Sequence, residues 1–267
     1  GAFIWDTLMQ HFALPQHGGF RCVAPNLRGF EKSSAPAEVA AYKPALMLQD
    51  IMALAGQEGV AGRIDTLVAH DWGGAFAWSA AHAHADRIDR LVIINSPHPG
   101  TFARELKNNP AQQKASAYMH FLARPDAEAL LAADDYRRMW PFFTTMRAGP
   151  EGFGWLTEAV RQQYRDVWGH GLTGACNLYR VTPLKPPLPG QAGDAIPLLT
   201  ADQVGVQVPT LVLWAMDDTA LLPGLLEGLD AYVPKLTVQP MPGATHWVVH
   251  EQPEAVAGHI GAFVASK

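Results

Sequence analysis

Short apolar runs alternate along this chain with longer segments whose apolar positions recur every three or four residues. The runs have the length of short buried strands, and they cover residues 20–25, 63–69, 91–95, 210–215 and 236–239. The longer segments predict amphipathic helices, at residues 44–58, 73–83 and 253–265. Strands that alternate with helices are typical of βαβ units, so the pattern predicts an α/β fold with a mostly parallel sheet flanked by helices.

This alternation stops between residues 99 and 182. The segment is rich in helix-forming and aromatic residues, among them Tyr118, Phe121, Trp140, Phe142, Phe143, Trp155, Tyr164, Trp168 and Tyr179. Such a pattern favours a helical cap inserted into the α/β core. We therefore expect residues 1–98 to form the first part of the core, residues 99–182 the cap, and residues 183–267 the second part of the core.

One motif between a predicted strand and a predicted helix suggests a nucleophile. The chain reads Val-Ala-His-Asp-Trp-Gly-Gly over residues 68–74, which places Asp71 between the small residues Ala69 and Gly73. This spacing is typical of the strained strand-to-helix turn that exposes a nucleophile, where we expect bulky side chains to collide with neighbouring backbone. A carboxylate there attacks an alkyl carbon and forms an ester, so the substrate should be an epoxide or a halide. Asp71 as a mere helix N-cap is the structural alternative.

An acid and a base for this nucleophile follow later in the chain. Asp217 and Asp218 come directly after the predicted strand at 210–215, and His246 comes shortly after the strand at 236–239. In α/β-hydrolases the catalytic residues occur in the order nucleophile, acid, histidine. Because the carboxyl ends of parallel strands meet at one edge of a sheet, these side chains are expected to converge there, with either aspartate able to orient His246.

Composition narrows the classes of partner. The chain has 267 residues, of which 48% are hydrophobic and 17% charged, and its net charge is −5. A large core is therefore expected, while the negative charge argues against nucleic acid and anionic membranes as partners. No apolar run approaches the ~20 residues of a membrane span. The two cysteines make a disulfide framework improbable, which favours a reducing, cytoplasmic location.

Metal and cofactor chemistry is not indicated. His82, His84 and Asp86 lie close together in the sequence. On a helix, however, His82 and His84 point to different sides and cannot clamp one ion. We therefore predict no metal site and no cofactor, with water as the second substrate. A homodimer is a hypothesis that neither composition nor motifs decide.

The chain resembles the epoxide hydrolases of the α/β-hydrolase superfamily from Trp5 to Phe263. The matching motifs are His-Asp-Trp-Gly-Gly at 70–74, Asn-Ser-Pro-His-Pro at 95–99, and His246-Trp247 with Glu251 and Pro253. An Arg-Gly-Phe segment at 28–30 also matches, although Glu31 stands where the family has glycine. The family's Trp-Gly-x-x-Asp corresponds to residues 214–218, so the resemblance favours Asp218 over Asp217 as the catalytic acid.

The resemblance also assigns two tyrosines in the predicted cap. In this family two cap tyrosines hydrogen-bond the epoxide oxygen and protonate the leaving alkoxide, and Tyr118 and Tyr179 match them. Asp71 would then attack an epoxide carbon, and His246, oriented by Asp218, would activate water to hydrolyse the ester. Trp72 and Trp247 would contact a small apolar epoxide as substrate-binding residues.

The resemblance is incomplete at the oxyanion hole. The Trp72 amide matches one donor, but the family's second donor comes from a His-Gly-x-Pro loop that the sequence lacks. The first strands of the fold are missing as well. We expect the loop and these strands to precede Gly1 in a longer protein; otherwise the chain would be impaired in ester hydrolysis.

Three other functions are alternatives to epoxide hydrolysis. Haloalkane dehalogenases share the aspartate nucleophile and the tryptophan after it, but have no need of two proton-donating tyrosines. Fluoroacetate dehalogenases resemble Asp-Arg-Gly-Gly at the turn, whereas this chain has Trp72 after Asp71. A binding protein on an inactive hydrolase fold is the third alternative, supported by the missing loop and by Glu31.

Overall fold

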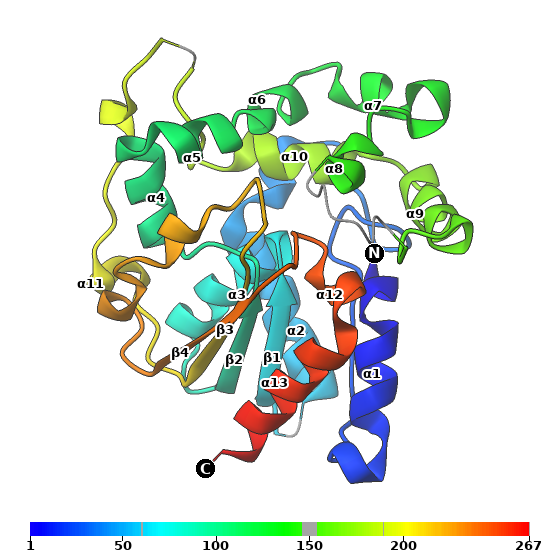
Figure 1. The fold of residues 1–267 in the computed structure, drawn as a ribbon, viewed down its shortest axis with the longest axis vertical. Helices are drawn as coiled ribbons and strands as arrows, with labels where there is room; N and C mark the ends of the chain where they lie inside the picture. Colours follow the sequence, from blue (N-terminus) through cyan, green and yellow to red (C-terminus); the bar gives the residue numbers. More distant parts are fainter. Residues whose placement is uncertain (60, 146–153, 189, 267) are drawn as a thin grey trace.

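The computed structural model describes residues 1–59, 61–145, 154–188 and 190–266. Residues 146–153 of the predicted cap therefore lie outside the described residues, as does residue 189 in the second part of the predicted core. The sheet has four parallel strands in the order β1-β2-β3-β4 (Figure 1). Their bounds are Ile64–His70 for β1, Ile88–Ile94 for β2, Thr210–Ala215 for β3 and Leu236–Met241 for β4.

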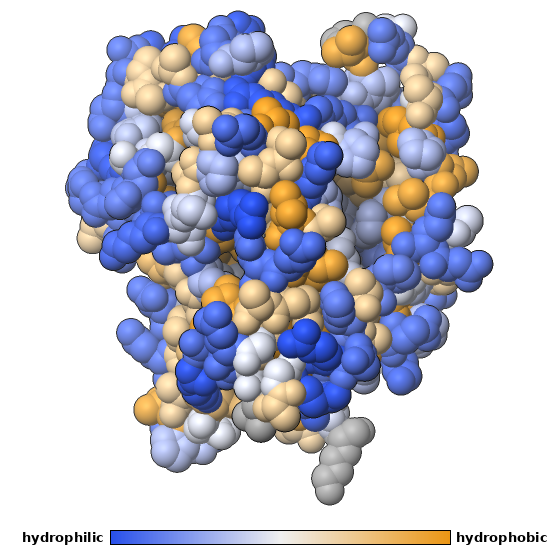
Figure 2. All heavy atoms as spheres, turned by 180° about the vertical axis from the view of Figure 1, so that it is seen from behind, coloured by the Kyte–Doolittle hydropathy of each residue, from blue (hydrophilic) through white to orange (hydrophobic). Residues whose placement is uncertain are grey.

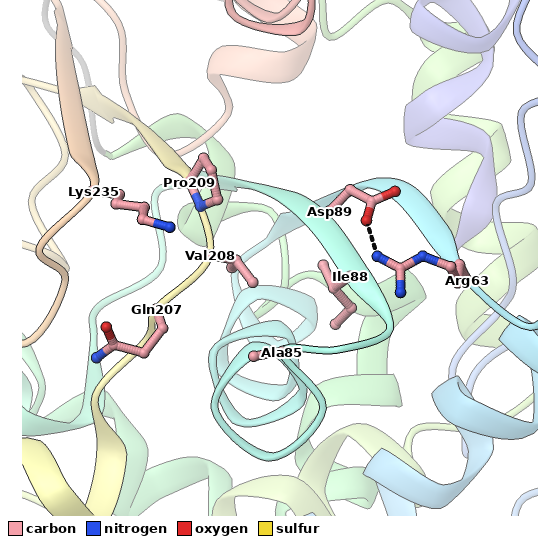
Figure 3. Close-up of a pocket in the computed structure, with 8 residues that line it drawn as sticks. All are labelled: Arg63, Ala85, Ile88, Asp89, Gln207, Val208, Pro209 and Lys235. Atoms are coloured by element: carbon pink, nitrogen blue, oxygen red, sulfur yellow. Dashed lines mark hydrogen bonds and ion pairs between the residues drawn. The ribbon is translucent and has the colours of Figure 1, made fainter. Parts of the chain in front are cut away.

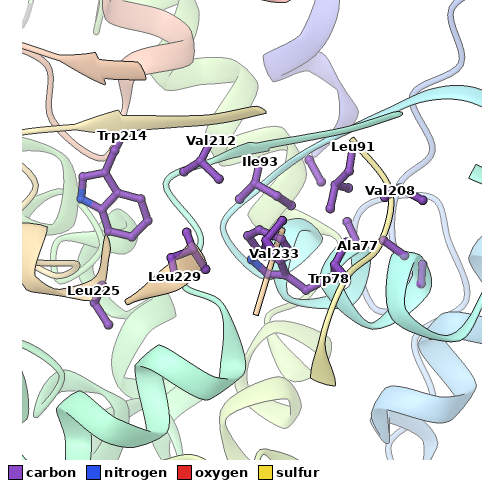
Figure 4. Close-up of a cluster of buried hydrophobic side chains, with 14 of the residues drawn as sticks. Ala77, Trp78, Leu91, Ile93, Val208, Val212, Trp214, Leu225, Leu229 and Val233 are labelled. Atoms are coloured by element: carbon purple, nitrogen blue, oxygen red, sulfur yellow. The ribbon is translucent and has the colours of Figure 1, made fainter. Parts of the chain in front are cut away.

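The two faces of the sheet bury alternate residues of the same strands, as a parallel sheet covered on both sides requires. On one face Leu91, Ile93 and Trp214 pack with Ala77 and Trp78 (Figure 4). On the other face the alternate residues of β2 and β3 pack with Leu8, Val256 and Ile260. The continuous apolar runs at 91–95 and 210–215 are explained by this burial on both sides.

Three helices match their predicted bounds to within one residue: α2 (Pro44–Glu58), α3 (Trp72–Ala83) and α13 (Pro253–Ala265). The helices α1 (Asp6–Ala13), α11 (Ala201–Val204) and α12 (Val248–Glu251) had not been predicted. Single-turn 3₁₀ helices occur at Ala2–Trp5, Pro15–His17, Val39–Tyr42, Gly193–Ala195, Pro223–Leu226 and Leu229–Ala231. Proline at the first position of α2 and of α13 has no amide to lose there, which explains why both helices start where the sequence predicted.

A run of helices occupies the described residues between β2 and α11. They are α4 (Pro99–Asn108), α5 (Pro110–Ala115), α6 (Tyr118–Leu122), α7 (Ala127–Tyr136), α8 (Pro141–Thr144), α9 (Glu158–Gly169) and α10 (Thr173–Val181). From α5 to α10 they lie beyond the carboxyl ends of the strands (Figure 1). An aromatic cluster that includes Phe143, Tyr164 and Trp168 holds them together. The segment boundaries at 98/99 and 182/183 stay predictions.

The predicted strand at residues 20–25 is wrong. These residues form an extended segment without strand pairing, and Val23 is 49% exposed. The segment pairs with none of the described strands, because each of the four pairs only with its neighbours in the sheet. An apolar run becomes a strand only when a neighbouring strand accepts its backbone hydrogen bonds.

Polar side chains cover most of the back of the molecule, with smaller apolar areas between them (Figure 2). The exposed large apolar side chains are spread along the chain, at Leu14, Val23, Val39, Leu188 and Leu198. Single exposed apolar residues are usual on folded domains. Within the described ranges, no helix is both long enough and apolar enough to cross a bilayer.

Candidate active site

Asp71 lies in a strained turn between β1 and α3. Its backbone has φ 51° and ψ −125°, a conformation that few residues other than glycine adopt. The Ser96 hydroxyl donates to the Asp71 carbonyl at 2.7 Å and holds the turn. Such a turn lifts the carboxylate out of the sheet edge, and the Asp71 side chain is 42% exposed.

Of the two glycines that follow Trp72, Gly74 is the one without room for a side chain. A Cβ atom at Gly74 would lie 2.3 Å from Cβ of Ser96, whereas one at Gly73 would lie 4.0 Å from Cβ of Ala69. A Cβ atom at Gly73 would therefore not collide with neighbouring backbone, contrary to the expectation for a side chain at this position. Close packing of α3 against the segment after β2 sets the constraint one residue later than the motif suggested.

His246 lies between two carboxylates. Its Nδ1 is 2.8 Å from Oδ2 of Asp218, and its Nε2 is 3.6 Å from Oδ1 of Asp71. His246 is 8% exposed and Asp218 only 3%. Asp217, the other candidate acid, is exposed. The structure thus brings Asp71, Asp218 and His246 together from three loops at one edge of the sheet.

Asp218 is held by hydrogen bonds from both sides. Its Oδ1 accepts from the amides of Ala220 at 2.8 Å and Leu221 at 3.1 Å. Its Oδ2 accepts from the side-chain amide of Asn95 at 2.8 Å as well as facing His246. The Asn95 oxygen in turn accepts from the Ala215 amide at 2.8 Å.

Asn95 is a site residue to which the sequence assigned no role. It is fully buried and has φ 39°, a left-handed conformation in which asparagine is enriched. Its signals in the sequence were its place directly after a predicted strand and the Asn-Ser-Pro-His-Pro motif that it begins. In the structure Asn95 links the ends of β2 and β3 to the carboxylate that faces His246.

The charges around His246 decide its protonation state. Burial disfavours the charged imidazole, but the charge of Asp218 and its hydrogen bond outweigh burial. With further contributions from Asp71 and Glu251, the pKa of His246 rises to about 9. Burial favours the neutral Asp218 carboxyl, yet His246 and Asn95 lower the pKa of Asp218 below its usual value. The two carboxylates thus favour the protonated form of His246.

A second histidine lies against His246. The Nε2 atom of His70 is 2.8 Å from the carbonyl oxygen of His246, and the two rings are 4.7 Å apart. Burial, with the charge of His246, lowers the pKa of His70 to about 4, so this ring is neutral and donates its N–H. His70, the neighbour of Asp71, thus holds the backbone of His246, a contact that the motif alone had not indicated.

Tyr118 and Tyr179 enter the site from the helices above the sheet. Tyr118 begins α6, and Tyr179 lies in α10. Their rings are 6.0 Å apart, and the Tyr179 ring is 5.1 Å from Trp72. Burial raises the pKa of both hydroxyls, and the nearby charge of Asp71 raises it further. Both phenols are therefore protonated and able to donate.

Asp71, His246 and the two tyrosines share a large cavity. Its volume is about 1450 Å³, and Asp71, Tyr118, Tyr179 and His246 line it. Trp72 and Trp247, the predicted substrate-binding residues, line it as well. The Trp247 indole is additionally engaged with the segment above the sheet, because Nε1 donates to the Phe142 carbonyl at 3.0 Å. Whether either tryptophan contacts substrate stays a prediction.

A smaller pocket lies at the opposite ends of the strands (Figure 3). Its volume is about 300 Å³, and it is lined by residues that precede or begin the four strands. Among them an ion pair joins Arg63 to Asp89. No catalytic side chain described above lines this pocket. The large cavity is therefore the candidate active site.

The amide of Trp72 is the first of α3. The first amides of an α-helix have no partner within the helix and attract negative charge. The Trp72 amide is thus available to a negatively charged oxygen beside Asp71. In the parts of the chain that the structure describes, no three His, Cys, Asp or Glu side chains are grouped as metal ligands.

Comparison with known proteins agrees with this geometry. A family model for the alpha/beta hydrolase fold matches residues 3–253. Epoxide hydrolase 4 of Mus musculus is 30% identical over 252 residues, which cover 92% of this chain and 66% of that protein. Epoxide hydrolase 3 of Xenopus tropicalis is 30% identical over 259 residues, 95% of this chain and 65% of that protein. The chain thus spans slightly less than two thirds of the length of these relatives.

Solved structures show the same likeness. One described among novel epoxide hydrolases in metagenomes from hot environments has a TM-score of 0.84 at 34% identity, covering 100% of this chain and 88% of that one. The epoxide hydrolase of Bacillus megaterium in complex with an inhibitor has a TM-score of 0.86 at 26% identity, covering 98% and 89%. The predicted resemblance is confirmed: this chain belongs to the α/β-hydrolase fold family, and these similar proteins within it are epoxide hydrolases.

Proposed function

We propose that this chain hydrolyses a small apolar epoxide to a vicinal diol through a covalent ester on Asp71. The observation that carries the proposal is the pair of buried phenols that share a cavity with this carboxylate. An epoxide must be attacked at carbon and protonated at oxygen, whereas a halide leaves as an anion and needs no proton. The likeness to epoxide hydrolases supports the same choice.

In the first step an Asp71 oxygen bonds to one epoxide carbon while the C–O bond of the ring breaks. The bonding electrons pass to the ring oxygen, which takes a proton from Tyr118 or Tyr179. The product is a hydroxyalkyl ester with no atom lost. Both phenols have raised pKa values, so each is protonated before the reaction, and the developing alkoxide is basic enough to take the proton.

In the second step His246 removes a proton from water, and the hydroxide attacks the ester carbonyl of Asp71. Asp218 orients the imidazole and stabilises the imidazolium through the 2.8 Å contact. The tetrahedral intermediate carries an oxyanion that the Trp72 amide can bind. Collapse of the intermediate breaks the ester C–O bond, and the leaving alkoxide takes the proton of the newly added hydroxyl, so that the diol and the Asp71 carboxylate result. The His246 imidazolium then returns its proton to the tyrosinate, which restores both side chains.

The substrate class is tested by giving the protein styrene oxide and, separately, 1-bromobutane. Diol from styrene oxide without bromide release is the expected result. Bromide release without diol would instead support a haloalkane dehalogenase that uses the same aspartate. Neither product over a broad panel of both substrate classes would support a binding protein on a hydrolase fold.

Removing one phenol should slow ester formation and leave ester hydrolysis unchanged. Tyr118→Phe and Tyr179→Phe each keep the buried ring but delete a proton donor, so each should lower the rate of ester formation by about 10²-fold. The double variant should be slower than either. Single-turnover kinetics separates the two steps, and equal slowing of both would contradict the role as proton donors.

Ester hydrolysis should speed up as the pH rises, because His246 acts as a base only when neutral. Its pKa is about 9 while Asp71 is charged. Forming the ester removes that charge, so the pKa of His246 in the intermediate falls below this value. We expect the ester to decay about tenfold faster per pH unit up to this lower pKa, and then to level off. Single-turnover decay rates from about pH 6 to about pH 10 test this; a flat profile would contradict it.

A further inference from the structure

Two residues that bind the helices above the sheet to the core lie on the chain just after the proposed base, His246. Trp247 follows His246, and His250 lies one turn later in α12. We propose that Trp247 and His250 are positioning residues: they clasp the helices above the sheet to the His246 loop and thereby hold Tyr118 over Asp71. The inference deepens the proposed function and rests on it for its kinetic part.

We call the contacts of Trp247 and His250 with the helices above the sheet the clasp. Trp247 makes the first of these contacts. Its Nε1 donates to the Phe142 carbonyl at 3.0 Å, and its ring stacks on Phe143 with centroids 4.0 Å apart and planes 15° from parallel. Phe142 also reaches the site itself, because its ring meets the Tyr118 ring edge-on at 6.0 Å. Phe142 therefore links Trp247 to Tyr118 through direct contacts with both residues.

The second contact is made by His250. Its Nε2 lies 2.9 Å from the Tyr164 hydroxyl, and its ring stacks on Trp155 at 4.6 Å with planes 3° from parallel. Burial lowers the pKa of His250 to about 4 and raises that of Tyr164, so the hydroxyl donates to a neutral imidazole. Tyr164 packs edge-on against Phe143, which joins the two contacts into one cluster.

The loop around His246 is held by hydrogen bonds that do not involve the helices above the sheet. Glu251 accepts from the Thr245 amide at 2.7 Å and from the Thr245 hydroxyl at 2.9 Å, which closes the loop around His246. His246 is further held by Asp218 and by His70. Loosening the clasp should therefore displace the tyrosines more than the base. Ester formation, which needs the tyrosines, should therefore slow more than ester hydrolysis, which needs the base.

Two variants delete one hydrogen bond each and keep the aromatic stacking. Trp247→Phe removes the donor to Phe142, and His250→Phe removes the acceptor for Tyr164. Each should slow ester formation about fivefold, which is the worth of one hydrogen bond, while ester hydrolysis changes by less than about twofold. Tyr136→Phe is the matched control, because its ring packs on Trp168 within the cap, and it should keep the rates of the unaltered protein.

Amide hydrogen exchange tests the clasp without any substrate. In both clasp variants, peptides that contain α6 and α10 should exchange faster, while peptides from α3 and α13 should not change. If the unaltered protein forms no ester but the exchange shifts as expected, the proposed function fails and the clasp stands.

Other results would overturn the clasp. Equal slowing of both chemical steps would mean that Trp247 acts on His246 rather than on Tyr118. Unchanged exchange and unchanged ester formation in both folded variants would show that the contacts position nothing. If either variant fails to fold, Tyr164→Phe deletes the same hydrogen bond as His250→Phe from the cap side and must reproduce the slow ester formation.

Discussion

Replacing Asp71 with asparagine should lower epoxide turnover by about 10⁴-fold or more, the usual scale for losing a nucleophile that acts as part of a catalytic unit. The amide cannot form the ester that the proposed mechanism requires. Asparagine has nearly the same shape as aspartate and is enriched at positive φ, so it should accept the φ of 51° at this position. Diol formation from styrene oxide measures the loss.

Asp217→Asn is the control for this experiment. It makes the same chemical change at an exposed aspartate in the loop that also carries the buried Asp218. This variant should turn over like the unaltered protein. Substantial diol formation by folded Asp71→Asn would mean that water attacks the epoxide directly, and the covalent route would then be rejected.

Replacing His246 with glutamine should stop the reaction halfway, with the substrate bound covalently to the protein. Asp71, Tyr118 and Tyr179 remain, so the ester can form, but no base activates the water that would hydrolyse it. Ring opening loses no atom. The peptide of residues 64–87, which contains Asp71, should therefore gain the full mass of one epoxide.

Mass spectrometry of the digested variant detects this adduct. The double variant Asp71→Asn/His246→Gln should show no adduct, which assigns the modification to the carboxylate. Diol release by His246→Gln at the rate of the unaltered protein would rule out His246 as the base. An adduct with 1-bromobutane that has lost bromide would shift the substrate class from epoxide to alkyl halide.

Most of the fold could be predicted because its local signals and its burial agree. The apolar run at 210–215 is buried along its whole length, and proline sets the start of the helices at 44–58 and 253–265. The strand at 20–25 failed for the opposite reason. A strand depends on hydrogen bonds to a neighbour, and the composition of a segment does not reveal whether a neighbour is present.

The candidate site divides in the same way. The spacing around Asp71 and the order of Asp218 and His246 could be found in the sequence because each lies within about five residues of the end of a strand. Residue-type patterns could not separate Asp217 from Asp218, which are adjacent. The structure separates them through burial: one is exposed, and the other is 3% exposed and faces His246.

By itself, the sequence determined the type of fold, the strand-to-helix turn at Asp71 and, through family resemblance, the two tyrosines. These features are recorded in the spacing of residues that are close together in the sequence, so they can be recognised without the structure. Tertiary structure alone decided that His70 holds the backbone of His246, that Asn95 braces Asp218, and that Trp247 reaches Phe142. The physical reason is distance along the chain. Contacts between residues separated by more than a hundred positions depend on how whole elements pack, and no local pattern records that packing.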